Sequence, residues 1–459
     1  METGYQREDA LFVKDCLAAA GRQMYACVVT FGCQQNEADS EKLRGMCREM
    51  GYAMTEAPEE ADLILMNTCA VREHAEQRAL SILGSFKHLK EKKPSLIIGV
   101  CGCMAAKPDR VQQFRRSLGY VNFSMRPGDL HRLPEMLKNA MTGGRRLFLE
   151  GEDSPPIAEE VPTLREHTHK AYISIMVGCN NFCSYCIVPH VRGRERSRAS
   201  GAILREAESL IRGGCREIML LGQNVNSYRS DCDFSTLLRR IDQIPGDYVL
   251  RFMSSHPKDV PEDLIRAMAE CTHIEKHFHL PLQSGSDKVL SEMNRRYTGE
   301  KYLSIVRRLR EAVPDIALTS DVMVGFPGET EEDFLATLEL LRRAEFDMVY
   351  SFIYSPRPGT PAAEREDQVP EAVKGERMRR LLALQDEISF GKNQQEVGRT
   401  LRILLDGKDK SGENYNGRTE SGKLVHLPAR DTEIGSFLKV KILRAEPYAL
   451  IAKRTEETV

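Results

Sequence analysis

Short apolar runs alternate with helical patterns in the first third of the chain. The runs at 23–30, 63–68 and 96–100 are typical of buried strands, and each is followed by a segment with helical periodicity. Strands that alternate with helices favour a parallel, doubly wound sheet. We therefore predict an N-terminal α/β domain over 22–150.

A second series of strand–helix units follows 151–169, an acidic, proline-containing and aperiodic segment that is typical of a linker. Six such units predict a partial (β/α)6, TIM-like barrel over 165–395, with functional groups at the carboxyl ends of its strands. The expected strands are 171–177, 217–221, 248–253, 277–282, 316–324 and 348–353.

The pattern changes again at 396–459, where short strands punctuated by glycines predict a small antiparallel β-barrel. Residues 397–459 hold 12 Lys and Arg against 9 Asp and Glu, a net charge of +3 on a chain whose net charge is −2. A small barrel with a basic face is typical of oligonucleotide-binding folds. A structural cap is the alternative.

The composition of the chain indicates the cellular environment in which we expect it to act. Apolar content of 41% and charged content of 29% are ordinary for a globular protein. The chain has no run of 18 apolar residues and no signal-peptide pattern in its first 20 residues, so we expect a cytoplasmic protein with no membrane partner. In that setting, 13 cysteines favour metal ligation over disulfides.

Three cysteines share one loop directly after the first strand of the central domain. Cys179, Cys183 and Cys186 stand at C-x3-C-x2-C spacing, which lets one loop wrap their thiolates around a single centre. Thiolates are preferred ligands of iron–sulfur clusters and of zinc. A structural zinc site has four protein ligands, and no second CxxC or HxxxH lies nearby. The spacing therefore favours a [4Fe–4S] cluster with one iron open.

A second set of cysteines is spread over the N-terminal domain. Cys33, Cys69 and Cys103 each follow the carboxyl end of a predicted strand. Those ends lie along one edge of a parallel sheet, so the three thiols are expected to converge on a second centre. Cys101 competes with Cys103 for the third position. Buried cysteines with no metal are the alternative for the whole set.

Polar residues follow the other strands of the central domain. Amides, hydroxyls and carboxylates suit an amino acid, a ribose and an adenine, and we expect four of them to line a cofactor pocket: Gln223, Asn224, Gln283 and Asp321. Arginines also crowd the segment after the cysteine loop and are either a solvated basic loop or phosphate contacts. They are Arg192, Arg194, Arg196 and Arg198.

Over nearly its whole length the chain resembles the radical S-adenosylmethionine (SAM) methylthiotransferases. TFGCQQNEADSE, NTCAVREHAEQ and GCMA resemble that family's N-terminal domain. GCNNFCSYCIVPHVRGRERSR, HLPLQSGSDKVLSEMNRRYT, DVMVGFPGETEEDF and YSPRPGTPAA resemble its radical SAM core. The tail, 396–459, resembles an RNA-binding TRAM domain. LLGQNVNSYR is similar to the MiaB-type branch, which acts on isopentenylated adenosine in tRNA.

The resemblance implies SAM and two [4Fe–4S] clusters as cofactors. Cys179, Cys183 and Cys186 would hold the SAM-binding cluster. Cys33, Cys69 and Cys103 would hold an auxiliary cluster, with Cys103 preferred because the family's third ligand stands in a Gly-Cys dipeptide. No catalytic residue is expected beyond these ligands.

The activity implied is methylthiolation of C2 of N6-isopentenyladenosine at position 37 of tRNA. SAM would supply the methyl group and the 5′-deoxyadenosyl radical, and sulfur would pass through the auxiliary cluster. Expected partners are the tRNA anticodon stem-loop, an electron donor such as a flavodoxin or ferredoxin, and an unidentified sulfur donor; the chain itself is expected to be a monomer. Alternatives are action on threonylcarbamoyl-adenosine in tRNA or on a ribosomal protein aspartate, or a non-catalytic iron–sulfur RNA-binding protein.

Overall fold

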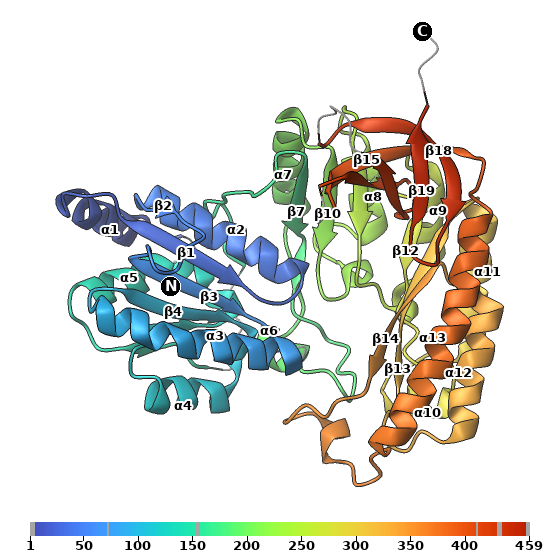
Figure 1. Ribbon diagram of the computed structural model, residues 1–459, viewed down its shortest axis with the longest axis horizontal. Coiled ribbons are helices and arrows are strands. Elements are labelled where there is room, and N and C mark those ends of the chain that lie inside the picture. Colours follow the sequence, from blue (N-terminus) through green and yellow to red (C-terminus); the bar gives the residue numbers. More distant parts are fainter. Residues whose placement is uncertain (1–4, 71–72, 152–156, 410–411, 429–433, 456–459) are drawn as a thin grey trace. The chain divides into compact units, whose positions relative to one another are not determined.

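The computed structural model describes residues 5–70, 73–151, 157–409, 412–428 and 434–455, and it forms two compact units (Figure 1). The first unit holds Met1–Glu166, Met176–Asn180 and Cys186–Arg198, and the second holds the remainder. The loop that carries Cys179, Cys183 and Cys186 is therefore divided between the two units. Cys179 and Cys186 belong to the first unit and Cys183 to the second.

The first unit is built on a parallel six-stranded sheet in the order β2-β1-β3-β4-β5-β6, which confirms the doubly wound fold. Its strands are β1 (Tyr25–Thr30), β2 (Ala53–Met54), β3 (Leu63–Thr68), β4 (Ile97–Gly102), β5 (Phe123–Met125) and β6 (Leu147–Phe148). A short hairpin is added by β8 (Met176–Val177) and β9 (Arg196–Ser197).

Helices cover both faces of this sheet (Figure 1). The helices α1 (Arg7–Ala19), α2 (Gln34–Glu49) and α5 (Leu133–Met141) bury apolar side chains with one face. The helices α3 (Glu73–Lys92), α4 (Pro108–Ser117) and α6 (Val188–Arg192) are associated with the other. The sequence pattern did not predict α1, β2, β5 or β6.

The second unit contains six parallel strands in two sheets, β11-β10-β7 and β12-β13-β14, joined by a bridge between Leu250 and Ile274. This arrangement confirms the partial (β/α)6 barrel. The strands are β7 (Lys170–Ser174), β10 (Glu217–Leu221), β11 (Val249–Phe252), β12 (His277–His279), β13 (Ala317–Val324) and β14 (Met348–Ile353).

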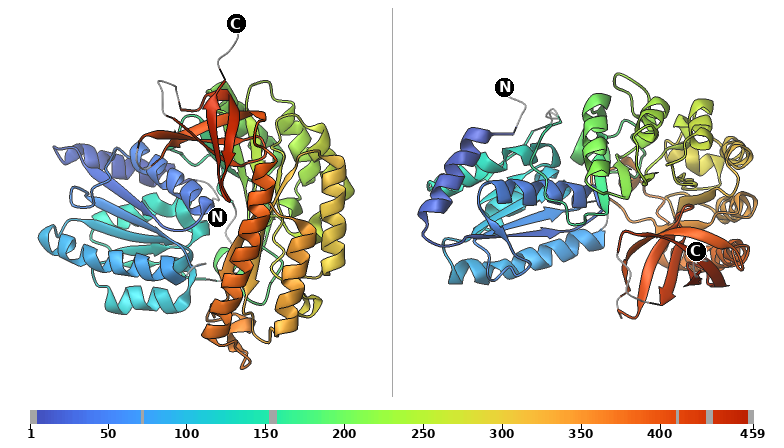
Figure 2. Two further views of the ribbon diagram at one scale, coloured as in Figure 1. Left: turned by 45° about the vertical axis from the view of Figure 1, so that its right-hand side comes forward. Right: turned by 90° about the horizontal axis from the view of Figure 1, so that it is seen from above.

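Helices with one apolar face stand on the outside of this half-barrel, as the views in Figure 2 show for its last helices. They are α7 (Ser200–Arg212), α8 (Phe234–Asp242), α9 (Glu262–Glu270), α10 (Asp287–Glu292), α11 (Gly299–Ala312) and α12 (Glu331–Ala344). The last helix, α13 (Glu371–Gln394), differs because most of the side chains that it buries are polar. The helix α12 begins with a capping box, in which Thr330 and Asp333 satisfy each other's backbone N–H groups.

The second unit ends in a closed five-stranded barrel in the order β15-β16-β17-β19-β18, which confirms the predicted barrel. The prediction that it is antiparallel is wrong for one pair, since β17 and β19 are parallel. Its strands are β15 (Thr400–Lys408), β16 (Asn414–Thr419), β17 (Leu424–Pro428), β18 (Phe437–Ala445) and β19 (Leu450–Arg454). Inward-facing apolar side chains from all five strands form its core. Within this unit the barrel is held by Lys423, whose Nζ lies 3.2 Å from Asp347 Oδ1 and 3.4 Å from Glu396 Oε1.

Candidate cluster and cofactor sites

Three cysteines of the first unit lie at the carboxyl ends of neighbouring strands. Cys33 follows β1 and precedes α2, Cys69 follows β3, and Cys103 follows β4 as the first residue of a short 3-10 helix. The strands β1, β3 and β4 are adjacent and parallel, so these ends share one edge of the sheet. Neither Cys69 nor Cys103 is exposed, whereas Cys33 is.

Two glycines allow these strand ends to approach closely. A Cβ on Gly32 would lie 2.8 Å from Cys69 Cβ, and a Cβ on Gly102 would lie 2.4 Å from the carbonyl oxygen of Thr68. Both glycines also have positive φ, +126° and +88°, which side chains disfavour. Glycine is therefore required by the packing of this edge at positions 32 and 102, directly before two of the three cysteines.

The pKa of Cys103 reflects its buried position at this edge of the sheet. Burial raises the pKa of Cys103 to about 11, the thiols of Cys69 and Cys33 act in the same direction, and the Arg192 guanidinium opposes them. Arg192 itself is buried and its Nη2 lies 3.1 Å from Asp39 Oδ2. Three thiols beside a cation form a donor set that fits an iron–sulfur cluster.

Cys101 is excluded from this group by its position inside β4. Its Sγ contacts the carbonyl oxygen of Met66 at 3.5 Å, and its side chain belongs to the apolar core against α2. Successive side chains of a strand point to opposite faces, which separates Cys101 from the strand-end edge.

Across the described ranges of the chain, no three His, Cys, Asp or Glu side chains are arranged to hold a single metal ion. Zinc would hold each sulfur about 2.3 Å from one point. Each cysteine ligand of a [4Fe–4S] cluster binds a different iron atom. The absence of such a group among the described residues therefore concerns only sites for a single metal ion.

The shared cysteine loop is fixed differently at its two ends. In the first unit, the Cys179 N–H donates to the Gly193 carbonyl at 3.2 Å, and a Cβ on Gly178 would lie 2.1 Å from the Arg194 carbonyl oxygen. In the second unit, Cys183 is 8% exposed and its Sγ accepts a hydrogen bond from Arg295 Nη1 at 3.6 Å.

The four cofactor-pocket candidates form two pairs in the second unit. Gln223 and Asn224 follow β10, and the buried oxygens Gln223 Oε1 and Asn224 Oδ1 have no hydrogen-bond partner among the described residues. The Gln283 N–H donates to the Asp321 carbonyl at 2.8 Å, and Asp321 Oδ1 lies 3.7 Å from His279 Nε2. Buried acceptors without donors are costly, so the first pair fits a ligand with N–H groups, as SAM has.

Ser255 and His256, which follow β11, lie in a polar strand-end run that the sequence indicates, but they were not among the four predicted pocket residues. The Lys258 N–H donates to His256 Nδ1 at 3.2 Å, so Nε2 carries the proton, and neither Nε2 nor Ser255 Oγ has a hydrogen-bond partner within the described chain. Burial, with nearby Arg295 and Lys258, lowers the pKa of His256 to about 2 and keeps the imidazole neutral. The polar run SSHP after an apolar strand was the signal that could have found them.

The arginines after the cysteine loop do not form one solvated patch. Arg192 is buried against Asp39, and Arg198 Nη2 lies 2.7 Å from Glu159 Oε2. The solvated-loop interpretation is therefore wrong for Arg192.

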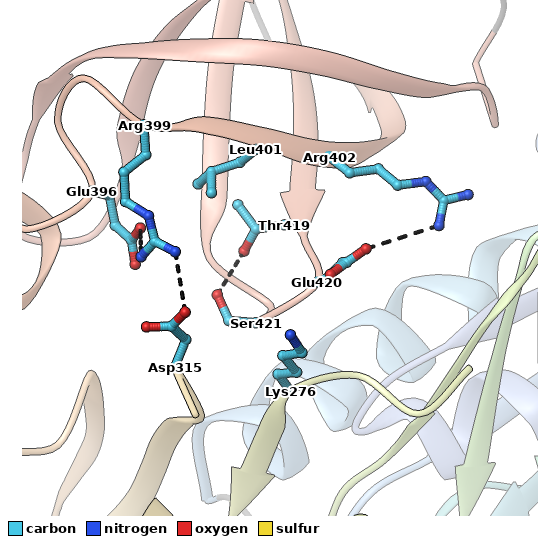
Figure 3. A pocket seen from close by; sticks show the side chains of 9 residues that line it. All are labelled: Lys276, Asp315, Glu396, Arg399, Leu401, Arg402, Thr419, Glu420 and Ser421. Atoms are coloured by element: carbon cyan, nitrogen blue, oxygen red, sulfur yellow. Dashed lines mark hydrogen bonds and ion pairs between the residues drawn. The ribbon is translucent and has the colours of Figure 1, made fainter. Parts of the chain in front are cut away.

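A cleft of about 70 Å³ lies between the C-terminal barrel and the loops before β12 and β13 (Figure 3). Charged side chains line it and pair with one another: Arg399 Nη2 lies 3.1 Å from Asp315 Oδ2, and Arg402 Nη1 lies 3.9 Å from Glu420 Oε1. This cleft is polar and lies within the second unit, and its acidic side chains are already paired with basic ones.

Three family models match the chain. Residues 173–341 match the Radical SAM superfamily, 25–122 match the Uncharacterized protein family UPF0004, and 394–454 match the TRAM domain. The half-barrel and its cysteine loop therefore define a radical SAM protein, for which a [4Fe–4S] cluster and SAM are the implied cofactors.

Curated relatives cover almost the whole chain. Proteins named tRNA-2-methylthio-N(6)-dimethylallyladenosine synthase from Caldicellulosiruptor saccharolyticus and Acetivibrio thermocellus are 48% and 46% identical to it, over 92% and 94% of this chain and 91% of each relative. The chain belongs to the family of tRNA-2-methylthio-N(6)-dimethylallyladenosine synthases, and it is an enzyme.

Solved structures share the fold. The radical SAM methyltransferase TsrM from Kitasatospora setae is 17% identical, with a TM-score of 0.56 over 74% of this chain and 75% of that one. The cobalamin-dependent radical enzyme OxsB is 14% identical, with a TM-score of 0.51 over 79% of this chain and 56% of that one. Among the described residues, no helix has the length and apolar character needed to cross a membrane.

Proposed function

We propose that this enzyme transfers a methylthio group to C2 of N6-isopentenyladenosine at position 37 of tRNA. The observation that carries the proposal is a second group of three cysteines, Cys33, Cys69 and Cys103, at the carboxyl ends of adjacent parallel strands, in a chain that also has a radical SAM cysteine loop. Relatives named for this modification support it over action on threonylcarbamoyl-adenosine, on a ribosomal protein, or a purely RNA-binding role.

The two cysteine sets would hold two [4Fe–4S] clusters. We assign Cys179, Cys183 and Cys186 to the cluster that binds SAM, and Cys33, Cys69 and Cys103 to an auxiliary cluster. When bound, these cofactors supply the methyl group, the sulfur and the radical chemistry that activates an aromatic C–H bond. The chain's own contribution is to position them with close-packed glycines and buried arginines.

The SAM pocket would be formed by side chains at the strand ends of the half-barrel. Gln223 and Asn224 offer unpartnered amide oxygens to N–H groups. Gln283 and Asp321 would form the second part of the pocket. The side chain of Asp321 is 27% exposed, so a hydroxyl or amine group of a ligand can reach it.

The C-terminal barrel offers a cationic surface for RNA. Lys441 on β18 and Lys453 on β19 are cross-strand partners, and both are exposed, as are Lys439 and Arg454. Like charges directly opposite one another destabilise a strand pair, so such a face is favoured when a phosphate backbone lies over it. The proposed division of labour is 22–150 for the auxiliary cluster, 165–395 for radical SAM chemistry and 396–459 for the anticodon stem-loop.

Other aspects of this function stay predictions from the sequence. They are a flavodoxin or ferredoxin as electron donor, a separate sulfur donor, a monomeric state and a cytoplasmic location.

Two cysteine variants test the proposal. Anaerobically reconstituted Cys69→Ala protein should still cleave SAM but add no methylthio group to tRNA, whereas Cys183→Ala protein should do neither. Cys101→Ala is the matched control, because this thiol lies in the core beside the site and should leave methylthiolation intact. Mass spectrometry of tRNA nucleosides gives the readout, and normal modification by Cys69→Ala would contradict the assignment.

A further inference from the structure

A buried arginine lies beside the second cysteine of the radical SAM loop. Arg295 is 4% exposed, and its Nη1 donates to Cys183 Sγ at 3.6 Å. Its Nη2 donates to the Pro281 carbonyl at 2.6 Å, and its Nε donates to the Tyr297 hydroxyl at 2.9 Å. The guanidinium plane is thus fixed by neutral acceptors on one side and directed at a cluster ligand on the other.

No carboxylate of the described residues forms an ion pair with Arg295. Buried charges are ordinarily paired, because removing an isolated ion from water is energetically unfavourable. Arg192, the buried arginine beside the other cysteine set, follows this rule through Asp39 at 3.1 Å. The positive charge of Arg295 is therefore available to neutralise a negatively charged group bound at Cys183.

The turn that carries Arg295 is bonded directly to the cysteine loop. Asn294 Nδ2 donates to the carbonyls of Asn181 and Phe182 at 3.2 and 3.0 Å. The Ser184 N–H donates to the Met293 carbonyl at 3.1 Å. These contacts join the turn that carries Arg295 to both sides of Cys183, and the hydrogen bonds to Pro281 and Tyr297 then place the guanidinium beside the sulfur.

We propose that Arg295 is a positioning residue that supplies the counter-charge of the SAM-binding cluster and raises its reduction potential; this rests on the proposed function only for the presence of that cluster. Three thiolates give a [4Fe–4S] cluster a net negative charge, and reduction makes it more negative. A nearby cation stabilises the reduced form more than the oxidised form, and hydrogen bonds to the sulfurs act in the same direction.

The test is a redox titration of the reconstituted full chain, followed by electron paramagnetic resonance. A Cys69→Ala background isolates the signal of the SAM-binding cluster. We expect Arg295→Gln to shift the potential to a more negative value, and Arg295→Lys, which keeps the charge, to shift it less. Arg296→Gln is the matched control, because Arg296 is the exposed neighbour and solvent screens its charge.

An Arg295→Gln potential equal to that of the parent protein would overturn the inference. If Arg295→Gln binds no cluster, the iron content of the Arg295→Lys protein is the test. Iron bound by Arg295→Lys supports the counter-charge role. Failure of both variants to bind iron overturns that role and leaves packing as the function of Arg295. A wild-type protein that cleaves SAM but never methylthiolates tRNA would instead contradict the proposed function, and the shift in potential would stand.

Discussion

The Arg192 guanidinium lies 3.1 Å from the Asp39 carboxylate, and both side chains are buried beside Cys103. The pair joins α6 to α2, two helices separated by more than 130 residues of sequence. It places a compensated cation next to the three thiols of the first unit.

Asp39→Asn should destabilise the protein, because it leaves the Arg192 charge buried without its partner. We expect a loss of about 3–5 kcal/mol in the free energy of unfolding, measured by urea denaturation. Replacing both residues, as Arg192→Met with Asp39→Leu, should cost less than Asp39→Asn alone. Equal stability of Asp39→Asn and the wild type would show that the pair contributes nothing.

Gly102→Ala should disrupt the auxiliary site without unfolding the second unit. The new Cβ would lie 2.4 Å from the Thr68 carbonyl oxygen and would displace the strand end that carries Cys103. Iron per chain should then fall from about eight to about four, since one of two cubanes is lost. Gly84→Ala in α3 is the control, because a Cβ there meets no atom within 4 Å. An unchanged iron count in Gly102→Ala would contradict the prediction.

His256 should make stability fall in mild acid. Burial, with nearby Arg295 and Lys258, lowers its pKa to about 2, so the folded protein keeps it neutral while the unfolded chain binds a proton below about pH 6.5. Stability from this group is therefore present above pH 6.5 and is lost as the pH falls, by up to about 1.4 kcal/mol per pH unit. His256→Gln should flatten the pH dependence of unfolding between pH 6.5 and 5.5. The same change at exposed His88 should not.

Charge reversal on the C-terminal barrel should weaken tRNA binding. Lys441→Glu with Lys453→Glu removes two exposed cations from paired positions of β18 and β19. The salt dependence of tRNA affinity should become shallower by about one unit of slope for each phosphate that the barrel no longer neutralises. SAM cleavage without tRNA should be unchanged, and Lys301→Glu on α11 should leave tRNA affinity intact. Full affinity in the double variant would place the RNA elsewhere.

The local pattern of the sequence was enough to define most of the elements. The predicted strands 217–221 and 348–353 coincide with β10 and β14, because each is a mostly apolar run of strand-forming residues bounded by polar segments. The short strands β5 and β6 and the helix α1 were not predicted. Two or three residues give no period, and α1 acquires its buried face by packing against α5 and α2.

The sequence by itself determined the class of fold and the shared loop of Cys179, Cys183 and Cys186, because strand–helix alternation and the C-x3-C-x2-C spacing are local properties of the chain. The tertiary structure placed the Cys101 side chain in the apolar core, and only the tertiary structure paired Arg192 with Asp39 and set Arg295 against Cys183. These contacts join positions more than 30 residues apart, and in the last two cases more than 100. Their charges interact strongly because folding removes water from around them, and no spacing along the chain records which distant side chains will share that environment.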